Sequence, residues 1–331
     1  MTRPICAKIS ALGTYVPPRV LSNTDLEKMV DTTSEWILER VGIRERHIAE
    51  KGIAASDLAV CAVRQMLETY PFDLQEVDLI VVGTVTPDMM YPSTACLVQH
   101  KLGIENTWGF DVSAGCSGFL YALNTGVKFV ESGQYKKVLV IGSDKNSSMT
   151  DYTDRAVCII FGDGAGAVLL EPSEDSLGVI DHVAQIEGLG GPYLCMPGGG
   201  SLNPATHETV DKKMHYIHQD GKSVFKYAVK KMAEMTERVL EKNKLTGRDV
   251  DCFIAHQANR RIITATADRL RMPMDKVIIN IDRFGNTTAG TIPIAMQTAV
   301  EEGKLKKGDL VLIAAVGAGF TSGATLLRWA F

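Results

Sequence analysis

The sequence lacks the features that mark several large classes of protein. No apolar run approaches the ~20 residues that a membrane-spanning helix needs. The seven cysteines are scattered along 331 residues without a C-x-x-C pair, which argues against a disulfide framework and against a zinc site. The net charge of −4 gives no general attraction to nucleic acid or to an anionic membrane. The first ten residues contain no hydrophobic signal segment, so we expect a cytoplasmic protein without a bound metal ion.

The composition is that of an ordinary globular protein. Hydrophobic residues make up 45% of the chain and charged residues 22%. Stretches typical of strands alternate with stretches typical of helices, which indicates an α/β protein. The length allows two domains or one duplicated domain.

One stretch, residues 111–123, combines a possible nucleophile with the turn that would present it. A short β-like run ends at Val112, small residues follow, and Cys116 precedes an apolar run with helical spacing. Gly115 and Gly118 permit a sharp turn beside the sulfur, as in a nucleophile elbow. A thiol at a helix start lies near the positive end of the helix dipole, which favours the thiolate. The alternative is a buried, unreactive cysteine.

Other segments set expectations for ligand binding. Ser34 is expected to cap a short helix that carries Trp36 and Arg40 on one face. Such a pair could enclose a flat aromatic ligand, or it could be an ordinary surface cation–π pair. Residues 161–170 are expected to form a strand whose glycines allow another backbone to approach. Residues 190–205 are expected to form a long surface loop that could act as a lid.

The second half of the chain repeats parts of the first. Residues 130–137 align with residues 300–307 at an offset of 170, and the same offset pairs Cys116 with Asn286. Two copies indicate a duplicated domain rather than a solenoid. We therefore expect Cys116 and Asn286 at equivalent turns, each at the start of one of two related helices.

A histidine follows an apolar strand in the second half. His256 comes directly after residues 252–255, at the end of the strand where α/β proteins bind ligands. By itself, His256 could be a satisfied structural residue, and Gly285–Asn286 could be an ordinary turn. Imidazole beside a thiol would support nucleophilic catalysis, because it can activate the thiol or donate to a developing oxyanion.

Several motifs resemble the β-ketoacyl-acyl-carrier-protein synthase III family. The matching stretches span the chain in the expected order and cover residues 33–37, 42–48, 111–119, 161–166, 255–259, 285–289 and 317–321. The resemblance implies a thiolase-like, five-layered αβαβα fold, made of two duplicated halves with mixed sheets around buried central helices. It divides the chain into residues 1–173, with Cys116, and residues 174–331, with His256 and Asn286.

The resemblance also implies an acyltransferase that condenses a short acyl-CoA with malonyl-acyl carrier protein, releasing CO2, and that uses no cofactor. Cys116 would carry the acyl group as a thioester. His256 and Asn286 would stabilise the enolate left after decarboxylation. The backbone amides of Cys116 and Ala318 would form the oxyanion hole for acyl transfer.

Binding residues follow from the same resemblance. The coenzyme A contacts would be Thr32, Trp36, Arg40, Arg155, Gly221, Phe225 and Asn259. The carrier-protein contacts would be Gln257, Ala258, Asn259, Arg260, Arg261, Lys226 and Lys230. Tyr91 would reach the acyl pocket of a partner subunit in a homodimer that pairs strands near residues 105–112, which favours starters from acetyl to about butyryl.

A basic patch supports the carrier-protein contact independently. Lys222, Lys226 and Lys230 recur every four residues and so share a helix face, and Arg260 and Arg261 follow His256 closely. A solvated helix face is the ordinary explanation for such a run. In an acidic protein, a basic patch near the site would steer an acidic carrier.

Two other functions stay open at this point. A relative from secondary metabolism would use the same three residues with another acceptor. A Cys–His–Asn hydrolase would release free acid from thioesters or peptides without a malonyl acceptor. A binding module without catalytic activity has no use for all three residues.

Overall fold

Two mixed β-sheets form the frame of the protein, whose computed structural model describes residues 5–175 and 177–331. The first sheet has the order β1-β7-β6-β4-β5. Its strands are β1 (Cys6–Tyr15), β7 (Asp163–Ser173), β6 (Val138–Lys145), β4 (Leu79–Gly83) and β5 (Trp108–Val112). The second sheet has the order β11-β12-β13-β8. Its strands are β11 (Cys252–Ala255), β12 (Leu310–Gly317), β13 (Thr321–Arg328) and β8 (Gly178–Ile186).

The two sheets share one topology. In the first sheet, β7 pairs antiparallel with both β1 and β6. In the second sheet, β13 pairs antiparallel with both β8 and β12 in the same way. On its other side, β6 pairs parallel with β4, and β12 likewise pairs parallel with β11. The repeat found in the sequence is therefore a repeat of structure. The proposed boundary after residue 173 coincides with the end of β7, where the connection to β8 begins, and its exact position stays a prediction.

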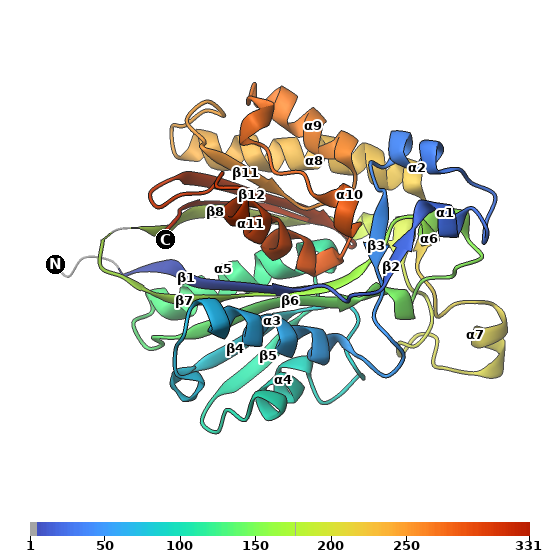
Figure 1. Ribbon diagram of the computed structural model, residues 1–331, viewed down its shortest axis with the longest axis horizontal. Coiled ribbons are helices and arrows are strands. Elements are labelled where there is room, and N and C mark those ends of the chain that lie inside the picture. Colours follow the sequence, from blue (N-terminus) through green and yellow to red (C-terminus); the bar gives the residue numbers. More distant parts are fainter. Residues whose placement is uncertain (1–4, 176) are drawn as a thin grey trace.

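Helices complete five layers, αβαβα, as Figure 1 shows. On the outer face of the first sheet lie α3 (Ala55–Thr69) and α4 (Thr94–Leu102). Over the second sheet lies α8 (Gly221–Lys242), which contacts α9 (Arg260–Arg269). Between the sheets lie α5 (Gly118–Glu131) and α11 (Thr291–Glu301). This is the fold class that the sequence predicts.

The central helix α5 is apolar on most of its circumference because it packs against both sheets. Phe119 and Leu123 are fully buried in it. A Cβ atom on Gly126 would lie 2.8 Å from the Val140 side chain, so a larger residue would push α5 away from the sheet. Truncating Leu123 to alanine would cost about 2–5 kcal/mol, the usual range for a buried leucine. This packing fixes the N-terminal end of α5, where Cys116 lies.

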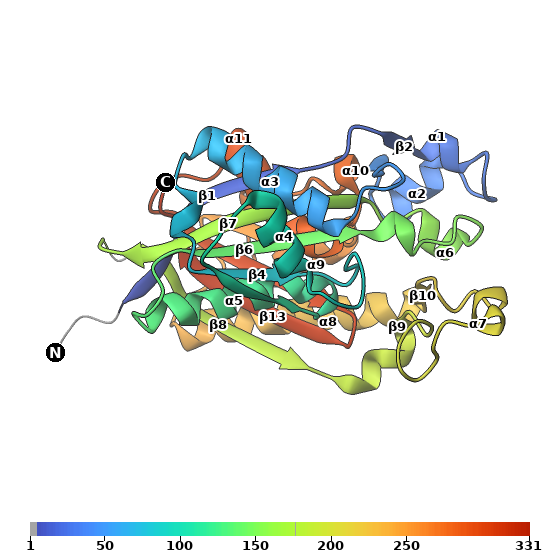
Figure 2. The ribbon, with the colours of Figure 1, turned by 90° about the horizontal axis from the view of Figure 1, so that it is seen from below.

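The shorter elements connect and cap these layers. The short strands are β2 (Val20–Ser22), β3 (Glu45–His47), β9 (Leu194–Cys195) and β10 (His218–Gln219). The short helices are α1 (Asn23–Leu26), α2 (Ser34–Arg40), α6 (Arg155–Cys158), α7 (His207–Asp211) and α10 (Ile281–Phe284). The 3-10 turns are η1 (Leu74–Glu76), η2 (Gly115–Ser117), η3 (Asn146–Ser148), η4 (Gly188–Tyr193), η5 (Met274–Lys276) and η6 (Thr288–Gly290). Most of the short strands and helices gather at one end of the layers, opposite the C-terminus (Figure 2).

Some local predictions need correction. The cap of α2 is Thr33 rather than Ser34, because the Thr33 hydroxyl accepts the backbone N–H of Trp36 at 3.1 Å. The expected loop over 190–205 contains part of η4 and the strand β9, which pairs with β10. The close backbone approach expected over 161–170 is confirmed at Gly162, where an added Cβ would lie 2.6 Å from the Phe284 carbonyl oxygen. None of the helices in the described ranges has the length and apolar character needed to cross a membrane.

Candidate active site

Cys116 lies where β5 turns into α5. It occupies the middle of η2, directly before the helix, and its side chain is 7% exposed. Gly115 has φ +55, a conformation that glycine adopts without strain. A Cβ atom there would lie only 2.6 Å from the backbone nitrogen of Ala318. The glycine therefore allows the loop after β12 to close against the cysteine.

The Cys116 thiol is protonated at neutral pH. Burial, together with the nearby Asp144 carboxylate, raises its pKa to about 12, although a hydrogen bond with the Asn286 side chain acts in the opposite direction. The thiolate that the helix start favours is therefore not the resting form. Because the nucleophile must be the thiolate, the thiol has to lose its proton during the reaction.

His256 directly follows β11 and is almost fully buried. Its backbone N–H donates to the carbonyl oxygen of Ala314 on β12 at 2.8 Å, and its Nδ1 lies 2.6 Å from the Thr291 hydroxyl. Its Nε2 has no hydrogen-bond partner among the described residues. Burial lowers the pKa of the imidazole to about 3, so the ring is neutral at physiological pH.

Asn286 lies in the turn between α10 and η6. Its backbone N–H donates to the carbonyl oxygen of Ile160, and its carbonyl oxygen accepts from the backbone N–H of Gly162, both at 3.0 Å. Its side-chain oxygen accepts the backbone N–H of Thr288 at 2.8 Å. With that oxygen fixed, the amide NH2 is the end left to face the site.

The structure brings the three predicted side chains together at one cavity. Cys116, His256 and Asn286 all line a cavity of about 600 Å³, although they come from distant parts of the chain. The sequence predicts this convergence through the repeat. Their catalytic roles stay a prediction that the geometry alone does not test.

The loop after β12 lies against the backbone of Cys116. A Cβ atom on Gly317 would lie 2.6 Å from the Cys116 nitrogen and 2.8 Å from the Ser117 nitrogen. The amides of Cys116 and Ala318 are thus close to each other, as the predicted oxyanion hole requires.

Most of the predicted coenzyme A contacts lie on the large cavity. The cavity is lined by Trp36, Arg40, Gly221, Phe225 and Asn259. Thr32 and Arg155 are not among its lining residues. Instead, the Arg155 guanidinium stacks on the Trp36 ring at 5.2 Å and donates to the Asp31 carbonyl oxygen at 2.8 Å. The cation beside Trp36 is therefore Arg155 rather than Arg40.

The predicted carrier-protein contacts divide into exposed and buried residues. Arg260, Arg261, Lys226 and Lys230 are exposed, and the Arg261 guanidinium stacks on the Phe225 ring at 4.9 Å. Ala258 and Asn259 line the cavity.

Gln257 is a correction to this set of contacts. It is 1% exposed, and its side-chain amide donates to the carbonyl oxygens of Ala255 and Ile278 while it accepts from the Asn280 backbone. The side chain therefore holds the chain after β11 and does not reach a partner.

A second, smaller cavity adjoins Cys116. It has a volume of about 180 Å³ and is lined mainly by apolar side chains. Its walls include Val85, Met149, Phe161, Leu194, Met196 and Ile217. Tyr91 is not among its lining residues and is 85% exposed in the single chain. Any role of Tyr91 at an acyl pocket therefore requires a second copy of the chain.

Sequence reasoning missed three polar residues behind the site. Asp144, Thr288 and Thr291 are buried and hydrogen-bonded around His256 and Asn286. No spacing rule marks them, because they act through contacts between segments far apart in the chain. No group of three or more His, Cys, Asp or Glu side chains in the described part of the chain could hold a metal ion.

The five-layered fold, with a cysteine at the start of a central helix beside a histidine and an asparagine, defines a thiolase-fold condensing acyltransferase. The profile of "3-Oxoacyl-[acyl-carrier-protein (ACP)] synthase III" matches residues 110–188, and that of its C-terminal part matches residues 240–329. The chain therefore belongs to the β-ketoacyl-acyl-carrier-protein synthase III family.

Individual relatives agree with this assignment over the full chain. The beta-ketoacyl-[acyl-carrier-protein] synthase III of Koribacter versatilis is 77% identical over 333 residues, covering 100% of both chains. The crystal structure of 3-oxoacyl-[acyl-carrier-protein] synthase III from Aquifex aeolicus is 44% identical, with a TM-score of 0.90 over 98% of this chain and 100% of that one. The priming beta-ketosynthase of the R1128 polyketide pathway is 33% identical, with a TM-score of 0.91 over 100% of this chain and 98% of that one.

Proposed function

We propose that the protein condenses a short acyl-CoA with malonyl-acyl carrier protein to give 3-oxoacyl-acyl carrier protein, CO2 and coenzyme A. The observation that carries this proposal is the single cavity at which Cys116, His256 and Asn286 meet, in a chain 77% identical to a named synthase of this kind. The two thioester substrates and one proton balance the reaction, so we expect no cofactor.

In the first half-reaction, the sulfur of Cys116 attacks the acyl carbonyl and coenzyme A leaves with the thiol proton. The backbone N–H groups of Cys116 and Ala318 would stabilise the tetrahedral oxyanion. His256 would transfer the proton, since its Nε2 has no partner among the described residues. The smaller cavity beside Cys116 would then hold the acyl chain, which favours starters from acetyl to about butyryl.

In the second half-reaction, the malonyl carboxylate leaves as CO2 and the remaining carbanion attacks the acyl carbonyl. Asn286 and His256 would donate hydrogen bonds to the thioester oxygen of the malonyl group, where the negative charge of the enolate develops. A well-placed donor of this kind contributes about 3 kcal/mol. The Cys116 sulfur leaves as a thiolate and takes up the one proton that the overall reaction consumes, since the original thiol proton has left with coenzyme A.

Substrate delivery would use the surface around the large cavity. Trp36, Arg40, Gly221, Phe225 and Asn259 would contact coenzyme A along the cavity, together with Arg155, whose guanidinium stacks on the Trp36 ring. Lys226, Lys230, Arg260 and Arg261 would bind the acidic carrier protein at the mouth. Since both substrates are cytoplasmic metabolites or proteins, we place the reaction in the cytoplasm.

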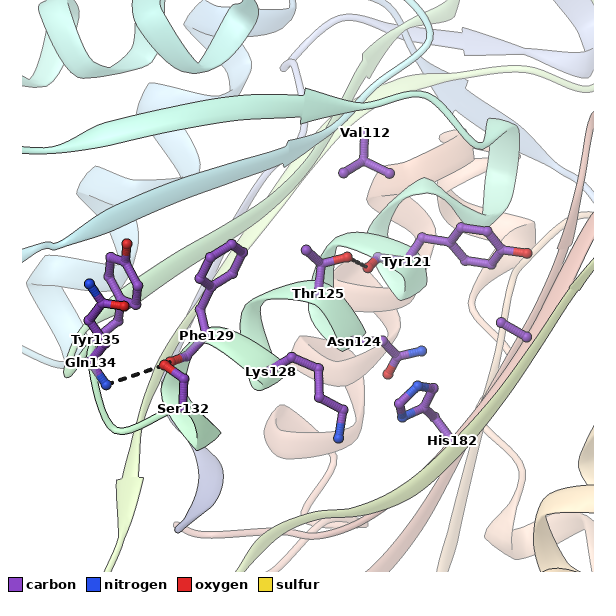
Figure 3. A pocket seen from close by; sticks show the side chains of 11 residues that line it. Val112, Tyr121, Asn124, Thr125, Lys128, Phe129, Ser132, Gln134, Tyr135 and His182 are labelled. Carbon is purple, nitrogen blue, oxygen red and sulfur yellow. Dashed lines mark hydrogen bonds between the residues drawn. The ribbon is translucent and has the colours of Figure 1, made fainter.

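We also propose a homodimer formed around β5. This strand is the edge of the first sheet, and among the described residues no further strand pairs with its outer side. Trp108 on β5 is 45% exposed, and Met90 and Tyr91 nearby in the chain are 78% and 85% exposed. A hollow of about 590 Å³, lined by α5 and by His182 of β8, lies between the edges of the two sheets (Figure 3). A second copy would cover this face, and light scattering would measure its mass.

The decisive experiment measures 14CO2 released from malonyl-labelled carrier protein in the presence of acetyl-CoA. We expect release that depends on both substrates, and its loss in the Cys116→Ser variant. Intact-protein mass spectrometry would show acetylation of the wild-type enzyme at Cys116. Release of free acetate without a malonyl acceptor would instead identify a hydrolase. Condensation only with another acceptor would identify a secondary-metabolism enzyme, and the likeness to the R1128 ketosynthase is the observation in favour of that function.

A further inference from the structure

Asp144 is a fully buried carboxylate that the proposed reaction does not use. It lies near the end of β6, and its exposed fraction is 0%. Its Oδ1 atom accepts hydrogen bonds from the segment that follows β4: the hydroxyls of Thr84 and Thr86 and the backbone N–H groups of Val85 and Thr86, at 2.8–3.1 Å. One oxygen therefore holds a segment of the first half of the chain.

The other oxygen holds the second half of the chain. Oδ2 accepts the Thr288 hydroxyl and, at 3.1 Å, the backbone N–H of Ala289. A carboxylate suits this place because both of its oxygens only accept hydrogen bonds. An asparagine side chain has the same shape, but its NH2 group would face one of the two sets of donors and leave those donors without an acceptor.

Thr288 connects this carboxylate to both proposed catalytic groups of the second half. Its backbone N–H donates to the side-chain oxygen of Asn286 at 2.8 Å. Its carbonyl oxygen accepts the hydroxyl of Thr291 at 3.0 Å, and that hydroxyl contacts Nδ1 of His256. Thr288 has φ +47, in the left-handed region that a β-branched residue rarely adopts. Its conformation must therefore be held by its surroundings.

We propose that Asp144 is a positioning residue for the condensation step, which acts through Thr288 to orient Asn286 and His256 toward Cys116. The proposal rests on the proposed function, since it assigns Asn286 and His256 to the second half-reaction. It explains why a carboxylate is buried at the junction of the two halves of the chain. The groups that meet in the cavity come from both halves, and Asp144 binds one half with each oxygen.

The test separates the two half-reactions in matched variants. Thr288→Ala removes the hydroxyl bond to Asp144, whereas Thr288→Ser keeps it. Asp144→Asn keeps the shape and removes one acceptor. Thr325→Ala is the control, because it removes a different buried hydroxyl bond, to Asn124 at 2.9 Å, on the far side of α5 from Asp144. Acylation of Cys116 by acetyl-CoA is followed by mass spectrometry and condensation by 14CO2 release, and circular dichroism gives the melting temperature.

We expect Asp144→Asn to lower kcat for condensation about 100-fold, the lower end of the range seen when an oxyanion donor is lost. We expect about tenfold for Thr288→Ala, which removes one of the hydrogen bonds to Asp144. Acylation should not fall in either variant, because Asp144→Asn removes a charge that raises the pKa of Cys116 and Thr288→Ala leaves that charge in place. Thr288→Ser should restore condensation to within about threefold of wild type. If Asp144→Asn does not fold, the two Thr288 variants decide the matter alone.

Two results would overturn the proposal. One is unchanged condensation in folded Asp144→Asn or Thr288→Ala. The other is an equal loss of acylation and condensation, in proportion to a fall in melting temperature, as in the control Thr325→Ala. That result would indicate a merely structural role. Absence of condensation in the wild type would refute the proposed function itself, and the positioning role would fall with it.

Discussion

The Thr291 hydroxyl lies between two polar atoms, 2.6 Å from Nδ1 of His256 and 3.0 Å from the carbonyl oxygen of Thr288. The hydroxyl carries one proton: when it donates this proton to the Thr288 carbonyl oxygen, the proton shared with the imidazole comes from Nδ1. The Nε2 atom, which has no partner among the described residues, then carries a lone pair. In this tautomer His256 can accept the thiol proton of Cys116. To donate to the enolate it needs its proton on Nε2, and the Thr291 hydroxyl would stabilise that tautomer by turning to donate to Nδ1.

Replacement of Thr291 by valine should therefore reduce activity with little change of shape. The variant removes the hydroxyl that donates to Nδ1 when the imidazole proton is on Nε2, and a buried acceptor left without its donor costs about 1–3 kcal/mol. If this cost falls on the transition state, kcat for condensation drops about 10- to 100-fold. Steady-state kinetics of 14CO2 release would measure it. Thr291→Ser keeps the hydroxyl and should stay near wild type, whereas equal activity of the valine and serine variants would contradict the tautomer argument.

The reactivity of Cys116 should rise steeply with pH. Burial and Asp144 raise its pKa to about 12, so below that value the thiolate fraction grows about tenfold for each pH unit. Burial lowers the pKa of His256 to about 3, so the imidazole stays neutral and adds no second inflection between pH 6 and 10. Alkylation by iodoacetamide over this range, followed by mass spectrometry, would test both points. The exposed Cys96 in the same digest reports on the reagent, and a plateau in the Cys116 rate below pH 9 would contradict the raised pKa.

The exposed cations on α8 should govern carrier binding and leave the chemistry intact. Reversing charge in Lys226→Glu and Lys230→Glu replaces attraction by repulsion toward an acidic carrier, so we expect KM for malonyl-carrier protein to rise about tenfold at low salt. The rate of acylation by acetyl-CoA should not change. Arg238→Glu makes the same charge change at an exposed position further along α8 and should have a much smaller effect. A similar rise in KM in all three variants would indicate an effect of net charge and not of a docking surface.

The sequence predicts the architecture well because that architecture depends on patterns within the chain. The repeat at an offset of 170 placed Asn286 opposite Cys116, and both line one cavity. Predictions based on one helix face or one neighbour were less reliable. Gln257 follows His256 in the chain, yet it faces inward. Trp36 and Arg40 both line the large cavity, but their spacing gives no sign that Arg155 stacks on Trp36. The buried network around Asp144 depends on contacts between residues 58 to 145 positions apart, for which a single sequence carries no local signal.

The close contact at Gly317 gives the sharpest test of the oxyanion hole. A Cβ atom at this position would lie 2.6 Å from the Cys116 nitrogen, so Gly317→Ala must displace the loop that carries the Ala318 amide. Loss of one oxyanion donor lowers the rate about 100- to 1000-fold, and we expect this loss in the acylation half-reaction measured by mass spectrometry. Gly191→Ala is the matched control, since nothing lies within 4 Å of the Cβ atom it would add. Normal acylation in a folded Gly317→Ala variant would remove the Ala318 amide from the mechanism.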